Sequence, residues 1–316
     1  MRHTNLLVLG GSGFIGRYVV GSLVARGCRV LVPSRRRARA RHLILLPTCD
    51  VVEGNIMDDV TLDRLVAGQD AVINLVGTLH GSQDEFQRVH VDLPRRVVAA
   101  CTKHKIGRLL HMSALGANAS APSMYLRSKA GGEVQVESGS PAWTLFRPSV
   151  VFGVEDRFLN LFAELAKWFP LLPIGCASAK FQPVWVEDVA RAIANSVDND
   201  VTFGRTYELA GPRIYTLREL VEFAAHAAGH PRPVIALPDG LAHFQARLME
   251  LLPGTPLLSR DNLDSMKVDS VASRQPFTPA PELGIGLTPL EPEAAFYLAG
   301  MSPRTRFSPM RARARR

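Results

Sequence analysis

The chain has 316 residues, of which 47% are hydrophobic and 21% are charged, and its formal net charge at pH 7 is +8. This apolar content is sufficient for a folded core, which excludes a chain that is disordered throughout. A membrane-spanning helix is not expected either, because the sequence contains no run of about 18 uncharged apolar residues.

The first half of the chain alternates short apolar runs with segments of helical periodicity. The patterns predict strands at residues 6–9, 29–32, 50–53, 71–76, 108–112 and 143–147, and helices at residues 15–25, 61–67, 86–104 and 125–138. The runs are apolar along their length, as in parallel strands that are covered on both faces. With right-handed crossovers, this alternation predicts an α/β fold with a doubly wound, Rossmann-type parallel sheet. Thr61 is the predicted N-cap of the second helix.

The pattern changes in the second half of the chain, where proline becomes frequent. Helices are predicted at residues 158–169, 186–197, 216–228 and 241–252, and Thr216 and Glu219 have the spacing of a capping box. We therefore predict a Rossmann domain over residues 1–150 and a smaller C-terminal α/β lobe over residues 151–300 that is interwoven with it. Residues 301–316, which are rich in arginine, are expected to form a disordered basic tail.

A glycine-rich loop joins the first predicted strand to the first predicted helix, with the sequence Gly10-Gly11-Ser12-Gly13-Phe14-Ile15-Gly16. Gly10 permits a tight turn, Gly13 lets the backbone approach a pyrophosphate, and Gly16 lets the helix pack closely against the sheet. The amides at the helix start then face the anion, with the helix dipole in support. This order of strand, loop and helix predicts a dinucleotide site. The alternative is a glycine-rich structural turn.

The end of the second predicted strand indicates which dinucleotide is bound. In the usual dinucleotide fold an acidic residue at this point accepts hydrogen bonds from the adenosine ribose. This chain has Ser34 followed by Arg35, Arg36 and Arg37 instead. Guanidinium groups bind a 2′-phosphate in bidentate geometry, whereas a 2′-hydroxyl would find only Ser34 as an acceptor. We therefore predict NADP(H) in preference to NAD(H), the alternative being arginines that face solvent and loosely bound NAD.

A second motif predicts redox chemistry. Tyr125 and Lys129 are four residues apart at the start of a predicted helix, so they share one helix face. An ammonium group beside the phenol is expected to lower its pKa. Tyr125 would then exchange a proton with a substrate oxygen while a hydride moves to or from nicotinamide. Ser113 follows the fifth strand, where its hydroxyl is expected to reach the same crevice and the same oxygen.

These motifs together resemble the short-chain dehydrogenase/reductase superfamily of the extended or atypical type, which is NAD-dependent epimerase/dehydratase-like. The resemblance is carried by the glycine loop, Asn74-Leu75-Val76-Gly77, Ser113, Tyr125 with Lys129, and residues 147–153, and it extends over residues 5–300. Within this superfamily, residues 111–117, 125–130 and 147–158 resemble the nucleotide-binding accessory subunit of respiratory complex I and its bacterial relatives.

The resemblance implies roles for individual residues. Cofactor contacts fall on Gly10, Ser12, Gly13, Phe14 and Ile15 at the pyrophosphate, Arg35 and Arg36 at the adenosine phosphate, Asn55 and Ile56 beside adenine, Leu75, Val76 and Gly77 beneath the ribose and nicotinamide, and Pro148 and Val151 near the carboxamide. Tyr125 is the implied proton donor, and Lys129 its partner, which also touches the nicotinamide ribose. His90 matches a helix position that is often Asn in extended members, where it supports the active site.

Two functions remain open at this point. The first is an NADP-dependent oxidoreductase that acts on a carbonyl, hydroxyl or quinone-like group of a lipophilic substrate, which apolar side chains in the second half would suit: Phe152, Phe158, Phe162 and Trp168. The second, implied by the complex I branch, is a protein that holds NADPH without turnover in a respiratory or membrane complex. Nucleic acid is not an expected partner, because no aromatic platform accompanies the basic segments.

Weaker features carry secondary expectations. The four cysteines lack metal-ligand spacing and are expected to be reduced, so no metal site is predicted. Gln182 is a candidate substrate contact, Trp185 is expected in the core, and Glu187 and Asp188 are expected at a helix N-terminus.

The segment 243–252 is amphipathic, and three roles are open for it: packing on the lobe, covering a substrate mouth, or resting on a membrane surface. Apart from the role implied for His90 by the resemblance, the scattered histidines are expected to be surface or packing residues: His80, His90, His104, His111 and His230. The apolar run at residues 6–9 is too short for a signal peptide, so a cytoplasmic location is expected. The alternative is peripheral association with the cytoplasmic side of the inner membrane.

Overall fold

A computed structural model describes residues 2–139, 141–251, 254 and 256–300, and the chain forms two compact units. The first unit contains the chain up to Pro148 together with Val186–Leu209 and Thr278–Gly286. The second contains Ser149–Trp185, Ala210–Phe277 and the chain from Leu287 onward. The tail predicted at residues 301–316 lies outside the described residues.

The first unit is built on a seven-stranded sheet with strand order β11-β6-β5-β4-β1-β2-β3. Its strands are β1 (Asn5–Leu9), β2 (Arg29–Ser34), β3 (Cys49–Glu53), β4 (Ala71–Asn74), β5 (Arg108–Met112), β6 (Ala142–Pro148) and β11 (Arg205–Leu209). All neighbouring strands are parallel. Outward from β1, the order runs to β2 and β3 on one side and to β4, β5 and β6 on the other. This is the order of a doubly wound Rossmann sheet, so the predicted fold class is confirmed.

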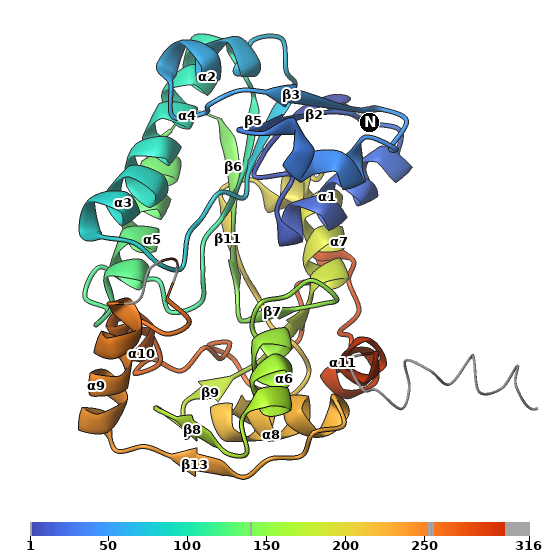
Figure 1. Cartoon of the computed structure of the whole chain (residues 1–316). Helices are drawn as coiled ribbons and strands as arrows, with labels where there is room; N and C mark the ends of the chain where they lie inside the picture. The colour runs from blue at the N-terminus through green and yellow to red at the C-terminus, as the bar shows by residue number, and fades with distance from the viewer. Residues whose placement is uncertain (1, 140, 252–253, 255, 301–316) are drawn as a thin grey trace, which may run out of the picture. The chain divides into compact units, whose positions relative to one another are not determined.

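Helices cover both faces of this sheet (Figure 1). Helices α1 (Phe14–Ala25) and α7 (Val186–Ser196) pack together on one face, and α2 (Asp59–Val66), α4 (Leu93–Lys103) and α5 (Met124–Glu137) lie on the other. A buried cluster fills the space under α2 and α4 and includes Leu9, Leu62, Val97 and Leu145. Glu187 and Asp188 lie in the first turn of α7, as predicted.

Helix α2 begins earlier than its sequence pattern indicates. The N-cap is Asp58, whose carboxylate accepts a hydrogen bond from the Thr61 amide at 2.8 Å. The prediction that Thr61 caps this helix is therefore wrong. Asp and Thr both favour this position, and here the acidic residue three positions earlier takes it.

The helix predicted at residues 86–104 is divided into three segments. These are α3 (Gln83–Gln87), a π-helical turn η2 (Arg88–Asp92) and α4, in whose first turn Pro94 lies. Proline has no amide hydrogen, so the ordinary bond from residue 94 to the His90 carbonyl cannot form. The Leu93 amide donates instead to the Arg88 carbonyl, five residues back. A π-helical turn leaves the hydrophobic periodicity almost unchanged, which explains why the sequence pattern did not predict it.

The second unit combines helices with three two-stranded sheets. Its helices are α6 (Leu159–Trp168), α8 (Leu217–Ala227), α9 (Asp239–Glu250), α10 (Arg260–Ser265) and α11 (Leu290–Ala299). Its strands pair as β7 (Val151–Phe152) with β10 (Val184–Trp185), β9 (Lys180–Phe181) with β12 (Tyr215–Thr216), and β8 (Leu172–Ile174) with β13 (Val234–Ala236). Helix α8 packs against α6 and α11. The predicted capping box of Thr216 and Glu219 is present at the start of α8.

The structure also decides several weaker expectations in the second unit. Trp185 is buried against Phe152, as predicted. Gln182 is completely buried, donates to the Gly211 carbonyl at 2.8 Å and accepts from the Ala272 amide at 3.0 Å. Both ends of its amide thus have partners within this unit, which argues against the predicted substrate contact. Trp168, one of the apolar side chains expected to suit a lipophilic substrate, is 73% exposed.

Candidate functional site

The glycine loop between β1 and α1 depends on the absence of side chains. Gly10 has a φ of +80°, and a Cβ atom there would lie 3.1 Å from the Leu75 carbonyl carbon. A Cβ atom on Gly16 would lie 2.3 Å from the Gly10 carbonyl oxygen, so no other residue fits without moving the loop. Gly16 therefore brings α1 against the loop itself, in addition to the sheet contact expected from the sequence.

The start of α1 is suited to an anion. Gly13 is the N-cap, no side chain caps the helix, and its first turn contains no acidic residue. The first amides of an α-helix lack partners within the helix, and the dipole makes this end positive. Gly13 is exposed, while Ser12, Phe14 and Ile15 are half-buried, so the loop backbone is accessible. The loop can therefore hold a phosphate group on main-chain amides.

Two predicted segments meet at the carboxyl ends of β2 and β3. Ser34 pairs with Glu53 in the parallel register, and the Gly54 amide donates to the Ser34 carbonyl at 3.1 Å. Arg35 and Arg36 are exposed directly after β2, and the buried Ser34 hydroxyl donates to the Arg36 carbonyl at 2.9 Å. Asn55 is exposed and Ile56 packs onto the core just after β3. The strand register thus brings the two segments to one edge of the sheet.

The turn after β4 is held by a buried pair of polar side chains. Asn74 is 1% exposed; its Oδ1 accepts from the Val76 amide at 3.1 Å, and its Nδ2 bonds to His111 Nδ1 at 3.1 Å. Leu75, Val76 and Gly77 follow in this turn. A Cβ atom on Gly77 would lie 3.3 Å from Lys129 Nζ and 3.6 Å from His90 Nε2. The turn therefore lies directly against two of the other predicted site residues.

Ser113 and Lys129 are joined through the end of β5. The Ser123 hydroxyl caps α5, which carries Lys129, and Lys129 Nζ donates to the Met112 carbonyl at 3.0 Å. Ser113 follows Met112 and is only 3% exposed. Its hydroxyl has no hydrogen-bond partner within the described part of the chain. A buried polar group without a partner is costly and uncommon, so this hydroxyl is available to a bound ligand.

The pKa values of Tyr125 and Lys129 differ from the sequence expectation. Burial raises the pKa of Tyr125 to about 12, and the expected lowering by the ammonium group does not appear. Burial lowers the pKa of Lys129 to about 8, with Glu133 acting in the opposite direction. At Lys129 desolvation outweighs the attraction of Glu133, and at Tyr125 desolvation is the cause of the shift. Tyr125 is thus held in its protonated form.

His90 lies in the π-helical turn and is tied to the start of α5. Its Nε2 accepts from the Thr78 amide at 3.1 Å, so the ring proton is on Nδ1, which donates to Ser128 Oγ at 2.8 Å. Ser128 in turn donates to the Tyr125 carbonyl at 2.7 Å, and the His90 and Tyr125 rings meet edge to face. Burial, with Lys129 and His111 nearby, lowers the pKa of His90 to about 2. His90 is therefore neutral and supports Tyr125.

Two buried polar residues were not predicted as part of this site. Glu133 is 4% exposed and accepts two hydrogen bonds from Arg147, at 2.7 and 2.5 Å. His111 is 2% exposed, and burial lowers its pKa to about 3. The spacing of Lys129 and Glu133 on one helix face was the available signal for Glu133.

Pro148 and Val151 are separated by the division into units. Pro148 ends β6, and its carbonyl accepts from the Leu115 amide at 3.0 Å. Val151 is half-buried in β7 and belongs to the second unit. The structure thus groups the first-unit members of the predicted set at the carboxyl edge of one sheet.

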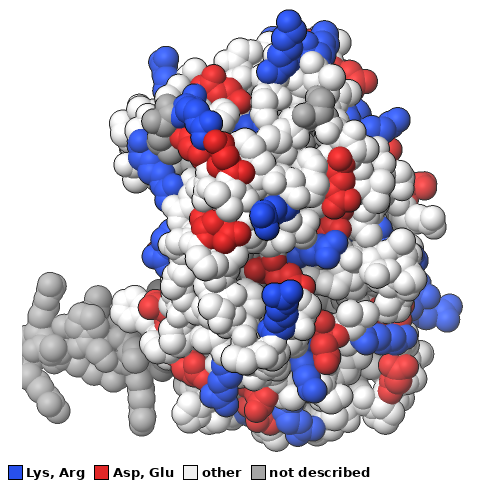
Figure 2. Space-filling model, turned by 180° about the vertical axis from the view of Figure 1, so that it is seen from behind, with Lys and Arg blue, Asp and Glu red and all other residues white. Residues whose placement is uncertain are grey.

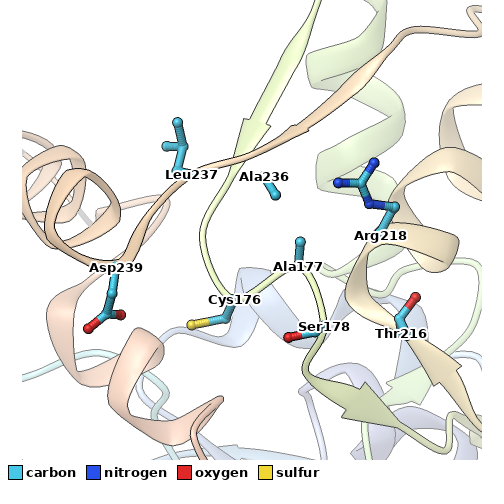
Figure 3. A pocket seen from close by; sticks show the side chains of 8 residues that line it. All are labelled: Cys176, Ala177, Ser178, Thr216, Arg218, Ala236, Leu237 and Asp239. Atoms are coloured by element: carbon cyan, nitrogen blue, oxygen red, sulfur yellow. The ribbon is translucent and has the colours of Figure 1, made fainter.

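A separate pocket of about 480 Å³ lies in the second unit (Figure 3). Arg218 and Asp239 lie on opposite sides of it, with Cys176 between them, and the lining is completed by Ala177, Ser178, Thr216, Ala236 and Leu237. None of the residues predicted for cofactor binding or catalysis lines this pocket. No cluster of three or more potential metal ligands occurs among residues 2–139, 141–251, 254 and 256–300.

The sheet order, the glycine loop, the buried Ser113 and Lys129 and the half-buried Tyr125 define a dinucleotide-binding α/β protein of the dehydrogenase type. The chain belongs to the NAD dependent epimerase/dehydratase family, whose model matches residues 6–210. This family comprises NAD(P)-dependent oxidoreductases and epimerases, so the predicted resemblance and nucleotide-binding character are confirmed.

Individual relatives fall into two groups. The chain is 34% identical over 295 residues to NADH dehydrogenase (ubiquinone) 1 alpha subcomplex subunit 9, mitochondrial, of Rattus norvegicus, which covers 90% of this chain and 77% of that protein. It is 32% identical over 241 residues to the ceramide reductase of Caulobacter vibrioides, with 73% of each covered. The predicted likeness to the complex I branch is thus confirmed, and an enzyme is among the relatives as well.

A solved structure supports the fold. The NADPH-dependent quinone oxidoreductase QOR2 of Escherichia coli, in complex with NADPH, matches with a TM-score of 0.73 over 92% of this chain and 99% of that one. The sequence identity is 19%, so this likeness establishes the shared fold alone.

Proposed function

We propose that the protein is an NADPH-dependent oxidoreductase that reduces a carbonyl or quinone-like group of a lipophilic substrate. The observation that carries this proposal is the buried Ser113 hydroxyl without a partner, one residue from the carbonyl that binds Lys129. A buried hydroxyl without a hydrogen-bond partner is costly, and a protein that serves only as a scaffold gains nothing from it. Ser113 would donate a hydrogen bond to the substrate oxygen, and Tyr125 would transfer its proton to that oxygen.

The protonation of the site is compatible with reduction of a substrate. A phenol with a pKa of about 12 holds its proton at neutral pH, which suits a proton donor. Lys129 stabilises negative charge that develops on Tyr125 as the proton leaves. Bound NADPH would supply the hydride. We propose that Tyr125 acts as the proton donor when the substrate is reduced.

The proposed cofactor contacts keep the positions inferred from the sequence. They are Gly10, Ser12, Gly13, Phe14, Ile15 and Gly16 for the pyrophosphate, Ser34, Arg35 and Arg36 for the 2′-phosphate, Asn55 and Ile56 for adenine, and Leu75, Val76, Gly77, His90, Tyr125, Lys129, Pro148 and Val151 toward the nicotinamide. The exposed guanidinium groups and the absence of any acidic residue from residue 34 to residue 41 support NADP(H) over NAD(H).

Replacing Arg35 and Arg36 by alanine tests this preference. We expect the affinity for NADPH to fall by about 10- to 100-fold, because charge-assisted bidentate contacts to the phosphate are lost. The affinity for NADH should stay within about twofold, since it has no 2′-phosphate. Calorimetric titration of both cofactors measures the two effects, with Arg39→Ala as a control in the same exposed segment. Equal losses for NADPH and NADH would contradict the assignment.

A lipophilic substrate is supported by one relative and by the second unit. The Caulobacter relative is named a ceramide reductase, and a ceramide is a lipid. In the second unit Phe158 packs against Phe162 and Phe181, with ring centroids 5.4 and 5.6 Å apart. We propose that these aromatic side chains favour a lipophilic substrate.

Catalysis is tested by NADPH oxidation with long-chain oxo-lipids and with quinones. Tyr125→Phe should lower kcat by about 100-fold or more, because the proton donor is lost, while NADPH still binds. Ser113→Ala should reduce kcat/KM by a smaller factor of about 10 to 100. Wild-type turnover that is unaffected by Tyr125→Phe would exclude the proposed role of this residue.

The second candidate is an NADPH-holding accessory protein of a respiratory complex, and the 34% identity to the rat NADH dehydrogenase subunit favours it. This candidate predicts that NADPH survives purification without turnover and that the protein sediments with respiratory membranes. Under either function we propose a cytoplasmic protein, with peripheral attachment to the inner membrane as the alternative. Assaying bound nucleotide and NADPH oxidation in one preparation separates the two candidates.

A further inference from the structure

Helix α9 in the second unit exposes its large apolar side chains. The stripe consists of Leu241, Phe244, Leu248 and Leu251, which are 57%, 60%, 50% and 76% exposed. Their spacing of three and four residues places them on one side of the helix. The opposite side buries the small residues Ala242 and Ala246 against Leu263. The helix is therefore fixed to its unit by small side chains and directs the large ones away from the core.

Such a stripe calls for an apolar partner, because contiguous exposed apolar surface marks an interaction site more often than scattered single residues do. The helix has 12 residues, and among the described residues no helix is long and apolar enough to cross a membrane. The helical period places the exposed Arg247 at the edge of the stripe. Apolar residues bordered by a cation are typical of a helix that lies in the plane of a lipid headgroup layer.

The distribution of charge favours an anionic bilayer as this partner. Residues 301–316 contain six arginines and no acidic residue, so they account for six of the eight excess positive charges. On the face shown in Figure 2, Lys and Arg are interspersed with Asp and Glu rather than gathered in one field. The excess charge thus belongs to the segment that follows α11 in the sequence. Basic segments near an anionic membrane are attracted to it electrostatically.

We propose that α9 docks the protein on the surface of an anionic lipid bilayer, with the apolar stripe among the headgroups and the arginines of residues 301–316 adding electrostatic attraction. An apolar helix face and a basic segment are each weak membrane anchors, but together they attach a protein to a bilayer stably and reversibly. This inference is independent of the proposed function, because it rests on the second unit and the charge of the chain.

Sedimentation of the purified full-length protein with vesicles tests the proposal. Phosphatidylcholine vesicles with phosphatidylglycerol should bind the protein, and phosphatidylcholine alone should bind it more weakly. The double variant Phe244→Ser/Leu248→Ser should lose about tenfold or more in affinity for the anionic vesicles. The matched control is Leu45→Ser/Val60→Ser, whose side chains are 90% and 78% exposed in the first unit, and it should bind like the wild type. A chain ending at residue 300 lacks the six arginines, so its remaining affinity for the anionic vesicles should come from the apolar stripe and should not change with salt concentration.

Two results would overturn the proposal. One is vesicle binding that the stripe variant leaves unchanged. The other is a wild-type protein that ignores vesicles but forms a dimer that the stripe variant dissociates, which would make a second copy of the chain the occupant. Thermal unfolding verifies that each variant is folded. Calorimetric NADPH titration of the same samples reports on the proposed function separately, so the failure of one proposal is distinguishable from that of the other.

Discussion

Two influences change the pKa of the buried Lys129 in opposite directions. Desolvation lowers the pKa, and the carboxylate of Glu133, one helical turn away, raises it. Glu133 is itself fixed by two hydrogen bonds from Arg147. The pKa of about 8 is therefore the outcome of this balance, and it keeps the ammonium charged at neutral pH.

Glu133→Gln tests this balance at the level of single residues. The substitution keeps the shape but removes the charge that raises the Lys129 pKa, so the pKa should fall further below its ordinary value. Activity that requires the ammonium should then decline at a lower pH, with about a three- to tenfold loss at pH 7.5. The pH profile of kcat/KM measures the shift. Glu137→Gln, an exposed position on the same helix, should leave the profile unchanged.

Helix α5 packs closely against the π-helical turn at Gly132. A Cβ atom on Gly132 would lie 2.1 Å from the His90 carbonyl oxygen, the same oxygen that Pro94 leaves without a helical donor. Pro94 favours the wider π-helical turn, and Gly132, which has no side chain, allows α5 to pack directly against this turn. Tyr125 and Lys129 are thereby placed beside His90, and a single buried methyl group would disturb this arrangement.

Gly132→Ala should destabilise the protein by about 2–4 kcal/mol, because either α5 or the turn must move. The control is Gly21→Ala in α1, where a Cβ atom meets nothing within 4 Å. That substitution should be neutral or stabilising by about 0.5–1 kcal/mol. Urea unfolding of both variants gives the comparison. A Gly132→Ala variant as stable as the wild type would show that α5 and the turn can separate without cost.

At the scale of the whole molecule, the buried histidines couple stability to pH. Both pKa values fall from the ordinary 6.5, to about 2 for His90 and about 3 for His111. The unfolded chain takes up protons on these rings below pH 6.5, while the folded chain does not until the pH approaches 3. Above pH 6.5 both rings are neutral in the folded and the unfolded chain, so their burial does not make stability depend on pH. As the pH falls from 6.5 toward 3, the free energy of unfolding decreases.

The melting temperature should therefore fall as the pH is lowered from 7 to 4. The variant His90→Asn lacks one of these groups. The slope of its unfolding free energy against pH should therefore be smaller than that of the wild type, by up to about 1.4 kcal/mol per pH unit. The variant should also be less stable at pH 7, because the bonds to Ser128 and Thr78 change. Thermal unfolding across this range measures both effects. The exposed His42→Asn should follow the wild-type curve.

The sequence allowed the first unit to be predicted more fully than the site or the second unit. Continuous apolar runs and short connections indicate parallel strands directly, and the glycine loop lies where the motif requires it. The π-helical turn, the Asn74–His111 pair and the ion pair of Glu133 with Arg147 depend on contacts between distant segments, which periodicity does not record. The exposed stripe of α9 has the same periodicity as a packed helix, so its direction was open until the structure was known.

Arg108, in β5, joins the seven-stranded sheet to the segment at the end of α7. Its guanidinium group is fully buried and donates to Ala142 and Thr144 in β6 and to Ser196, Val197 and Thr202 near the end of α7. A gene fragment that stops at residue 150 would therefore keep the cation and lose three of its five acceptors, together with the β11 partner of β6. Such a fragment would expose an apolar strand edge and aggregate. Expression of a minimal nucleotide-binding module has to include residues 186–209.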